Sequence, residues 1–479
     1  MKRIFYLILC LMAFSTAASA RDGYKVTVRF TDIKDTTLYL AHYYGVPLPK
    51  IYRADSAKVD RNGMAVLQSK EKTLGGIYII LLSDGKTYFE FLLNNGDDMS
   101  ITATTSNLPG SLKFKNSPEN DGFIGYENFL TDFGKGQSAL QASMAGAKTK
   151  SDSEAVRKKM IASGKELINY RRKYVAEHPG TFLTNIFNAL EVPQVPEGLH
   201  YDEKGKVDSA YSYLYYKAHF WDKFDFRDDR LIQTPIYDAK IDEYMNKLVL
   251  PYVDSVEKES DMILAKTRGT KDMFKYSLWW LTRFTEQSKI MGMDEAFIYL
   301  VENYYMKGDA TWLSQTDLEK YFKRVNELKP NTIGHIAPDI QMQDVSGKPV
   351  PLSSIKAKYT LVVFWEPSCG HCQHEIPALD SVYESSLKAK GVKVYSVRTD
   401  DPVPQWQKFI KEHHLEDWVN VYDPEHHSNY HSDYDVKATP TIYLLDEKKI
   451  IRGKKLDHTN VLQLIEMLEK KEKTAKAGN

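Results

Sequence analysis

Two cysteines, Cys369 and Cys372, stand between an apolar stretch and a predicted helix, and this placement constrains the fold more than any other feature. The apolar stretch, residues 360–365, is typical of a buried strand. The helix is predicted over residues 369–388. Cysteines at positions i and i+3 of one helix share a face, at a separation that permits a disulfide. The sequence therefore predicts a thiol pair where a strand ends and a helix begins.

Strands and helices alternate through the last part of the chain. After the turn-rich residues 331–358 and the first strand and helix, further strands are predicted at 392–397, 419–422 and 441–445, and further helices at 405–413 and 459–470. This order predicts a central sheet flanked by helices, which is an α/β fold.

The position of each cysteine predicts its chemistry. At the start of a helix, unpaired N–H groups and the positive end of the helix dipole stabilise a thiolate, so the pKa of Cys369 should lie below about 8.5. Cys372, one turn further in, should be more buried and protonated. Cys369 is thus the predicted nucleophile, which forms a mixed disulfide, and Cys372 the resolving thiol. An inert structural disulfide is the alternative, but such a short bridge closes almost no loop.

Other residues near the thiols are candidates for tuning or proton transfer. Gly370 and His371 separate the cysteines, and a protonated His371 would favour the thiolate and make the pair more oxidising. Glu375 could shuttle the proton of Cys372, or it could be an exposed acid that interacts with the helix dipole. Downstream, a cis peptide is expected before Pro440, so that Thr439 faces the thiols and pairs with substrate backbone.

The first twenty residues predict a secretory signal peptide. Lys2 and Arg3 precede an apolar run over residues 4–14, and small residues at 18–20 predict cleavage after Ala20. The mature chain would keep only two of the three cysteines and no apolar run long enough for a transmembrane helix. We therefore expect a soluble protein in an oxidising compartment, the periplasm or cell envelope. The balance of 64 basic and 64 acidic residues argues against nucleic acid as a partner.

The region before the α/β part divides into a β-rich and a helical module. Alternating residues 24–30 and hairpin signals at 61–63, 83–85 and 94–96 predict a small β-sandwich within 21–116, with a binding or packing role. Residues 117–330 are predicted to be all-α. Within them, residues 137–159 are interpreted as a mobile loop or a solvated helix. An aromatic cluster at 211–226 could line a groove for a peptide or glycan, but core packing is favoured. The predicted domains are thus a signal peptide (1–20), a β-rich module (21–116), a helical module (117–330) and an α/β domain (331–479).

Five motifs of the chain occur in the same order as in a known family. They are Ile336-Ala337-Pro338-Asp339, Phe364-Trp365, Cys369-Gly370-His371-Cys372, Glu375-Ile376-Pro377 and Thr439-Pro440-Thr441. The segment that contains them resembles the thioredoxin superfamily, and within it the TlpA/ResA-like envelope thiol–disulfide oxidoreductases. More loosely, the whole chain is similar to multidomain envelope proteins of the Bacteroidota whose β-rich and helical modules precede a thioredoxin domain.

The resemblance implies a function and a set of partners. It implies disulfide exchange with protein substrates and with an envelope redox partner, substrate contacts by Trp365, Thr439 and Pro440, and no cofactor beyond the Cys369–Cys372 disulfide. Ser368 and Val363 depart from the thioredoxin pattern, which has a Trp and a buried Asp at these positions. Proton transfer is therefore expected to depend on Glu375 or water.

Three alternatives remain open at this point. Cys369, His371, Cys372 and His374 are close enough in sequence to suggest a metal site, although the strand–CxxC–helix context favours redox chemistry, and no metal is expected. A non-catalytic thioredoxin-fold binding protein is the second alternative, and a disulfide isomerase or oxidant, in place of a reductant, is the third. Covalent haem is excluded because Gln373 follows the second cysteine.

Overall fold

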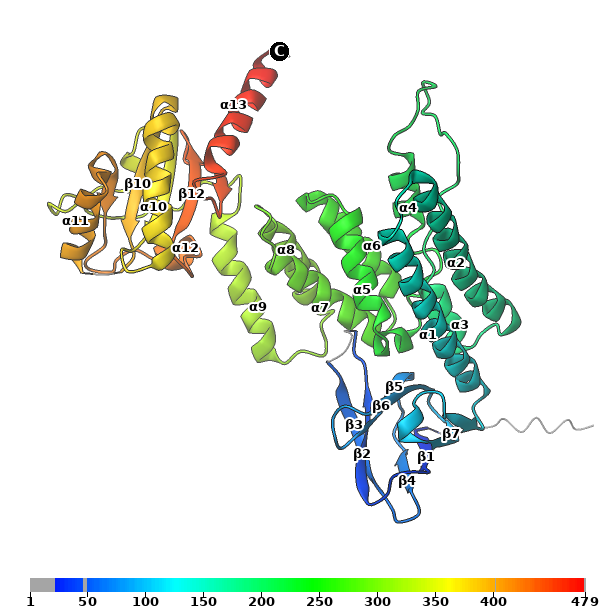
Figure 1. The fold of residues 1–479 in the computed structure, drawn as a ribbon. Helices are drawn as coiled ribbons and strands as arrows, with labels where there is room; N and C mark the ends of the chain where they lie inside the picture. The colour runs from blue at the N-terminus through cyan, green and yellow to red at the C-terminus, as the bar shows by residue number, and fades with distance from the viewer. Residues whose placement is uncertain (1–21, 46–49, 401, 478–479) are drawn as a thin grey trace, which may run out of the picture. The chain divides into compact units, whose positions relative to one another are not determined.

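The computed structural model describes residues 22–45, 50–400 and 402–477, and the chain divides into two compact units (Figure 1). Unit 1 contains the chain up to Leu248 together with Gly269–Met273, and unit 2 contains Val249–Arg268 and the chain from Phe274 onward. The predicted signal peptide and its cleavage site after Ala20 lie outside the described residues. The division at Leu248 falls inside the range 117–330, so the domain ranges drawn from the sequence stay predictions.

The strands of unit 1 form two four-stranded sheets. One has the order β4-β1-β7-β8, from β1 (Tyr24–Phe30), β4 (Met64–Ser69), β7 (Asp98–Ala103) and β8 (Lys113–Lys115). The other has the order β3-β2-β5-β6, from β2 (Thr36–His42), β3 (Tyr52–Val59), β5 (Gly76–Leu82) and β6 (Tyr88–Leu93). Alternate residues Val26, Val28 and Phe30 of β1 are buried, as the sequence alternation predicts. The β-rich character of the N-terminal module is therefore confirmed.

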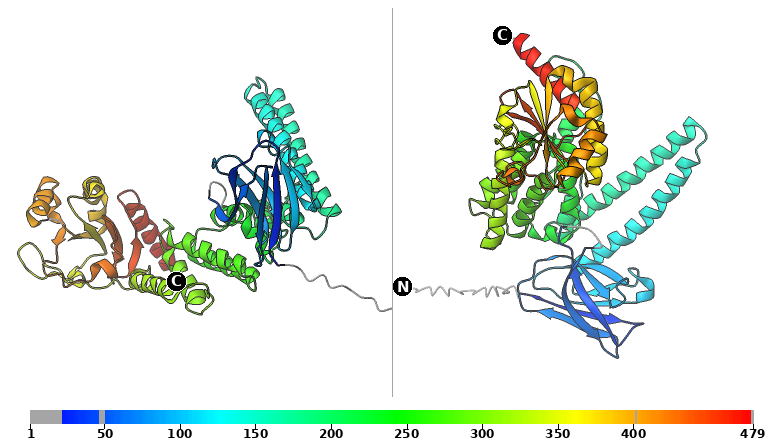
Figure 2. Two further views of the ribbon diagram at one scale, coloured as in Figure 1. Left: turned by 90° about the horizontal axis from the view of Figure 1, so that it is seen from below. Right: turned by 90° about the vertical axis from the view of Figure 1, so that its left-hand side faces the viewer.

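The helices of unit 1 are α1 (Pro118–Ala145), α2 (Lys150–Glu177), α3 (Phe182–Ala189), α4 (Tyr211–His219) and α5 (Ile236–Glu243). The helices α1 and α2 lie side by side as a hairpin (Figure 2). The stretch 137–159 is thus helical apart from a short turn, and α2 begins at a capping box formed by Thr149 and Asp152. In the aromatic cluster, Phe220, Trp221, Phe224 and Phe226 are buried, as core packing predicts, whereas the tyrosines of α4 are at least partly exposed.

Unit 2 combines helices with the C-terminal sheet. Its first helices are α6 (Val253–Thr267), α7 (Asp272–Glu286, from Phe274 onward), α8 (Asp294–Leu300) and α9 (Gln315–Leu328). The sheet has the order β11-β10-β9-β12-β13, from β9 (Tyr359–Trp365), β10 (Val392–Arg398), β11 (Val419–Val421), β12 (Thr441–Asp446) and β13 (Ile451–Lys454). Strands β9, β10 and β11 are parallel, whereas β12 and β13 are antiparallel to their neighbours.

Helices cover both faces of this sheet. On one face pack α10 (Gly370–Val382), α11 (Val403–Glu412) and α13 (Val461–Ala477) (Figure 1). The short α12 (Tyr430–Asp433) and the segment 337–355 cover the other. Every residue of β9 is buried because β9 is the central strand and both of its faces are covered. The predicted multidomain fold class, with a β-rich N-terminus, a helical middle and a C-terminal α/β thioredoxin-like domain, is confirmed.

No helix of the described ranges is both long enough and apolar enough to cross a bilayer.

Candidate functional site: a thiol pair at the start of a helix

Cys369 and Cys372 lie at the point where β9 is followed by α10. Cys369 is the N-cap residue of α10, and its sulfur accepts a hydrogen bond from the backbone N–H of Cys372 at 3.3 Å. Cys369 is partly exposed, whereas Cys372 has no exposed surface. The expected placement of an outer and an inner thiol on one helix turn is therefore observed, with both residues present as free thiols.

The surroundings drive the pKa values of the two thiols apart. For Cys369, burial opposes ionisation, but hydrogen bonds from Thr439, Cys372 and the backbone of His371 outweigh it and lower the pKa below that of an ordinary thiol. For Cys372, burial dominates and raises the pKa to about 12. At neutral pH the outer sulfur is thus the available nucleophile, and the inner one holds its proton.

The loop before β12 contacts the thiols from the side opposite the helix. The Thr439–Pro440 peptide is cis, as predicted. The carbonyl oxygen of Thr439 accepts a hydrogen bond from the Cys369 thiol at 3.2 Å, and both Thr439 and Pro440 are partly exposed. These two residues therefore border the thiol that a substrate must reach.

The residues between the cysteines are open to solvent. His371 is exposed, and its backbone N–H is one of the donors to Cys369. A side chain at Gly370 would meet nothing within 4 Å, so packing does not demand glycine there. This dipeptide is thus a place where the sequence can change the charge beside the thiolate without disturbing the core.

Glu375 is engaged by another residue of the same domain. The backbone N–H of His458 donates to Oε1 of Glu375 at 2.5 Å, and Nδ1 of His458 lies 2.7 Å from Oε2. Both carboxylate oxygens therefore connect α10 to the residues just before α13. The proton-shuttle role of Glu375 stays a prediction.

Trp365 does not border the site as predicted. Its side chain has no exposed surface, and its indole N–H donates to the hydroxyl of Ser396 at 2.7 Å. As the last residue of β9, it points into the core beneath α10 and α11. The prediction that Trp365 contacts substrate is wrong for this reason.

Glu366 also belongs to the site, although no motif in the sequence marks it. Its Oε1 accepts a hydrogen bond from the hydroxyl of Thr439 at 3.0 Å, and its backbone interacts with Cys372. The only signal in the sequence is its place in the loop that joins β9 to the first cysteine.

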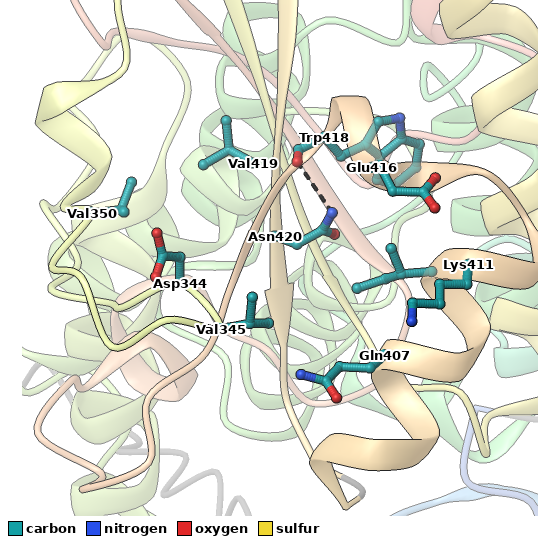
Figure 3. A pocket seen from close by; sticks show the side chains of 10 residues that line it. Asp344, Val345, Val350, Gln407, Lys411, Glu416, Trp418, Val419 and Asn420 are labelled. Atoms are coloured by element: carbon teal, nitrogen blue, oxygen red, sulfur yellow. Dashed lines mark hydrogen bonds between the residues drawn. The ribbon is translucent and has the colours of Figure 1, made fainter.

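A separate pocket of about 480 Å³ lies at the β11 edge of the same sheet (Figure 3). Val419 and Asn420 of β11, Gln407 and Lys411 of α11 and Asp344 of the preceding segment contribute to its lining. The hydrogen-bond partners given above for Cys369 and Cys372 are not among its lining residues. In the described ranges, no group of three or more His, Cys, Asp and Glu side chains is placed to hold a metal ion.

Comparison with known proteins places these observations in a family. Residues 333–454 match the AhpC/TSA family, residues 148–331 match a domain of unknown function (DUF5106), and residues 24–123 match another (DUF4369). The fold and the thiol pair thus define a protein of the thioredoxin class.

Individual relatives agree with this class. The chain is 30% identical over 120 residues to "Thioredoxin-like protein YneN" of Bacillus subtilis, covering 25% of this chain and 68% of the relative. It is 28% identical over 151 residues to "Thiol-disulfide oxidoreductase ResA" of Bacillus cereus, covering 31% of this chain and 83% of the relative. A solved domain of a "possible thiol-disulfide isomerase" from Cytophaga hutchinsonii is 36% identical, with 30% of this chain and 96% of that one covered and a TM-score of 0.28. The chain belongs to the thioredoxin-like thiol–disulfide oxidoreductases, and it is an oxidoreductase.

Proposed function

We propose that the chain exchanges disulfides with protein substrates through Cys369 and Cys372. The observation that supports this most is the opposite ionisation of two sulfurs one helix turn apart, with the pKa of Cys369 lowered by hydrogen bonds and that of Cys372 raised by burial. A thiolate that is exposed and a thiol that is protected are what a two-step exchange needs.

The exchange proceeds through a mixed disulfide. The Cys369 thiolate attacks one sulfur of a substrate disulfide, forming a bond between the two proteins while the other substrate sulfur leaves as a thiolate. Cys372 then loses its proton and attacks Cys369, which breaks the intermolecular bond and releases the second substrate thiolate. Two electrons pass to the substrate, and Cys369 and Cys372 end as a disulfide. The reverse sequence oxidises a substrate dithiol. The Cys369–Cys372 couple carries both electrons, so the proposed reaction requires no added cofactor.

The rim of the site suits an extended polypeptide. Thr439 accepts a hydrogen bond from the Cys369 thiol, and both Thr439 and Pro440 are partly exposed. Proteins with accessible disulfides are therefore the proposed substrates, and an envelope redox partner would return the pair to its starting state. We assign the β-rich and helical modules a role in selecting or docking these substrates.

Reduction of insulin by a chemical reductant tests the nucleophile. Cys369→Ser should abolish the catalysed rate, because a serine hydroxyl is not ionised at neutral pH, whereas Cys372→Ser should accumulate mixed disulfides that are visible on non-reducing gels. Undiminished activity in Cys369→Ser would contradict the assignment. Absence of any trapped mixed disulfide in Cys372→Ser would favour a non-catalytic binding protein.

We also propose that the chain is exported to the periplasm and cut after Ala20. Support comes from the two basic residues, the apolar run and the small residues at 18–20. N-terminal sequencing of the protein from the periplasmic fraction should begin at Arg21. An intact N-terminus on protein in the cytoplasmic fraction would contradict export.

A further inference from the structure

The hydroxyl of Thr439 lies between the buried thiol and a carboxylate. The hydroxyl of Thr439 interacts with the Cys372 thiol. The same hydroxyl donates to Oε1 of Glu366 at 3.0 Å. Glu366 lies in the loop between β9 and α10 and is only half-buried, so its carboxylate connects the interior of the site to its outside. The thiol, the hydroxyl and the carboxylate are thus neighbours in this order.

The resolving step requires a path for a proton. Cys372 must lose a proton before it can attack the mixed disulfide, and it has no exposed surface. Burial raises the pKa of this thiol to about 12, so hardly any of it ionises unaided near neutral pH. A neighbouring hydroxyl can take the proton only if it passes its own proton on, and Glu366 is the acceptor to which the Thr439 hydroxyl already donates.

We propose that the proton of Cys372 leaves through the hydroxyl of Thr439 to the carboxylate of Glu366 during the resolving step. This rests on the proposed function. As Cys372 Sγ bonds to Cys369 Sγ, its proton moves to Thr439 Oγ1, and the Thr439 proton moves to Glu366 Oε1. The bond from Cys369 to the substrate breaks, and the substrate sulfur departs as a thiolate. The products are the Cys369–Cys372 disulfide, a substrate thiolate and a protonated Glu366, and the path runs backwards when a substrate is oxidised.

Glu366 and Glu375, the two carboxylates near the start of α10, have different hydrogen-bond partners. Both oxygens of Glu375 are engaged by His458, at 2.5 Å and 2.7 Å. Glu366 instead accepts from two hydroxyls, that of Thr439 at Oε1 and, at 3.5 Å, that of Thr399 at Oε2. Tyr430, whose pKa is raised to about 12 by burial and by nearby charges that include Glu366, stays protonated near neutral pH, where the variants are compared.

Single-turnover reaction with a symmetrical nitrophenyl disulfide separates the two steps. The reduced full-length protein releases one coloured thiolate when Cys369 attacks and a second when Cys372 resolves the mixed disulfide. The variant Glu366→Gln keeps an oxygen that can accept from Thr439 but removes the base. We expect its first phase to match wild type and its second phase to be about tenfold slower near neutral pH. This difference should shrink as alkaline pH ionises Cys372 directly.

Further variants make the outcome decisive. Thr439→Val should slow the second phase as Glu366→Gln does, and Thr439→Ser should restore it, because serine keeps the hydroxyl. Glu412→Gln, at the exposed end of α11, is the matched control and should leave both phases unchanged. A second phase within twofold of wild type in Glu366→Gln would overturn the relay, and a slow second phase in Glu375→Gln alone would move the proton path to Glu375. If the wild-type protein showed no first phase, Cys369 would not attack the disulfide, and the proposed function itself would be contradicted.

Discussion

At the scale of single residues, Cys369 and Cys372 have the same side chain, but their positions three residues apart shift their pKa values in opposite directions. Cys369 caps α10 and receives hydrogen bonds that favour its thiolate, whereas Cys372 lies one turn deeper, where burial favours its thiol. Hydrogen bonds at the N-terminus of a helix and removal from water act in opposite directions on a thiol. The difference in reactivity is therefore a property of position, and it can be measured directly.

Alkylation with iodoacetamide should follow this difference. Because the folded-state pKa of Cys369 is lowered, its thiolate persists as the pH falls below about 8.5, where an ordinary thiol is already protonated. Cys369 should therefore react selectively at neutral pH. Cys372, with a pKa raised to about 12, should react only after unfolding. Mass spectrometry of alkylated peptides over a pH series measures both, and a midpoint for Cys369 at or above that of a free thiol would contradict the assignment.

The exposed His371 should set part of the redox potential. A positive charge beside the Cys369 thiolate stabilises the reduced form, so His371→Pro should make the couple more reducing, by about 30 mV for a tenfold change in the equilibrium. Equilibration with glutathione buffers measures the potential. His374→Asn removes a neighbouring exposed histidine outside the dipeptide and is the control, with a smaller expected change. An unchanged or more oxidising potential in His371→Pro would contradict the tuning argument.

The sequence predicted the residues of the site where a motif fixes their spacing, and missed those whose role depends on packing. The placement of Cys369 and Cys372 at the start of α10 and the cis peptide before Pro440 were predicted correctly, whereas the catalytic role of the cysteines stays a prediction. Glu366 has no spacing signature, because its contact with Thr439 joins residues far apart in the chain. The family resemblance implied a substrate contact by Trp365, yet the pleat of the strand turns its side chain into the core.

At the scale of elements, a helix or strand could be predicted only where the sequence has a strong hydrophobic pattern or helix-start signal. The central strand β9 and the helix α10 follow from a continuous apolar run and a helix-start signal, and both are present. The edge strand β13 (Ile451–Lys454) was missed because four residues that include a glycine and a lysine carry no strand signal. Its Gly453 packs closely against α13, since a Cβ there would lie 2.5 Å from the side chain of Leu464 and would force a local shift.

The hairpin of α1 and α2 shows the same limit. Residues 137–159 are rich in serine, alanine and lysine, and their weak apolar pattern left a loop and a helix as alternatives. In the structure the stretch is helical, and α1 and α2 contact each other through aromatic side chains outside it, with Phe129 stacked on Tyr170 at 4.5 Å between ring centroids. Such contacts join residues about forty positions apart, and a local pattern cannot reveal them.

At the scale of the whole molecule, the boundary between the two compact units falls inside the helical module that the sequence predicts. Residues 249–268 and 274–330 belong to the unit that contains the thioredoxin-like domain, although their helical pattern groups them with the preceding residues. A buried ion pair shows why. Lys454 of β13 donates to Asp294 of α8 at 2.7 Å and to Asn331 at 2.5 Å. The helical residues therefore satisfy a charge that the sheet alone would leave unpaired.

This buried pair should make the helices and the sheet of unit 2 depend on each other. Lys454 is only 3% exposed, so Asp294→Ala leaves a buried ammonium without its counter-ion and should destabilise unit 2 by about 3 kcal/mol or more. The double variant Asp294→Leu/Lys454→Met removes both charges and should recover much of that loss, because no unpaired charge remains buried. Denaturant unfolding followed by tryptophan fluorescence measures both. Glu412→Ala breaks an exposed pair with Lys408 and should leave the midpoint unchanged. If Asp294→Ala were as stable as this control, the stability of the sheet would not depend on the helices. The thioredoxin-like domain would then be energetically independent of residues 249–330.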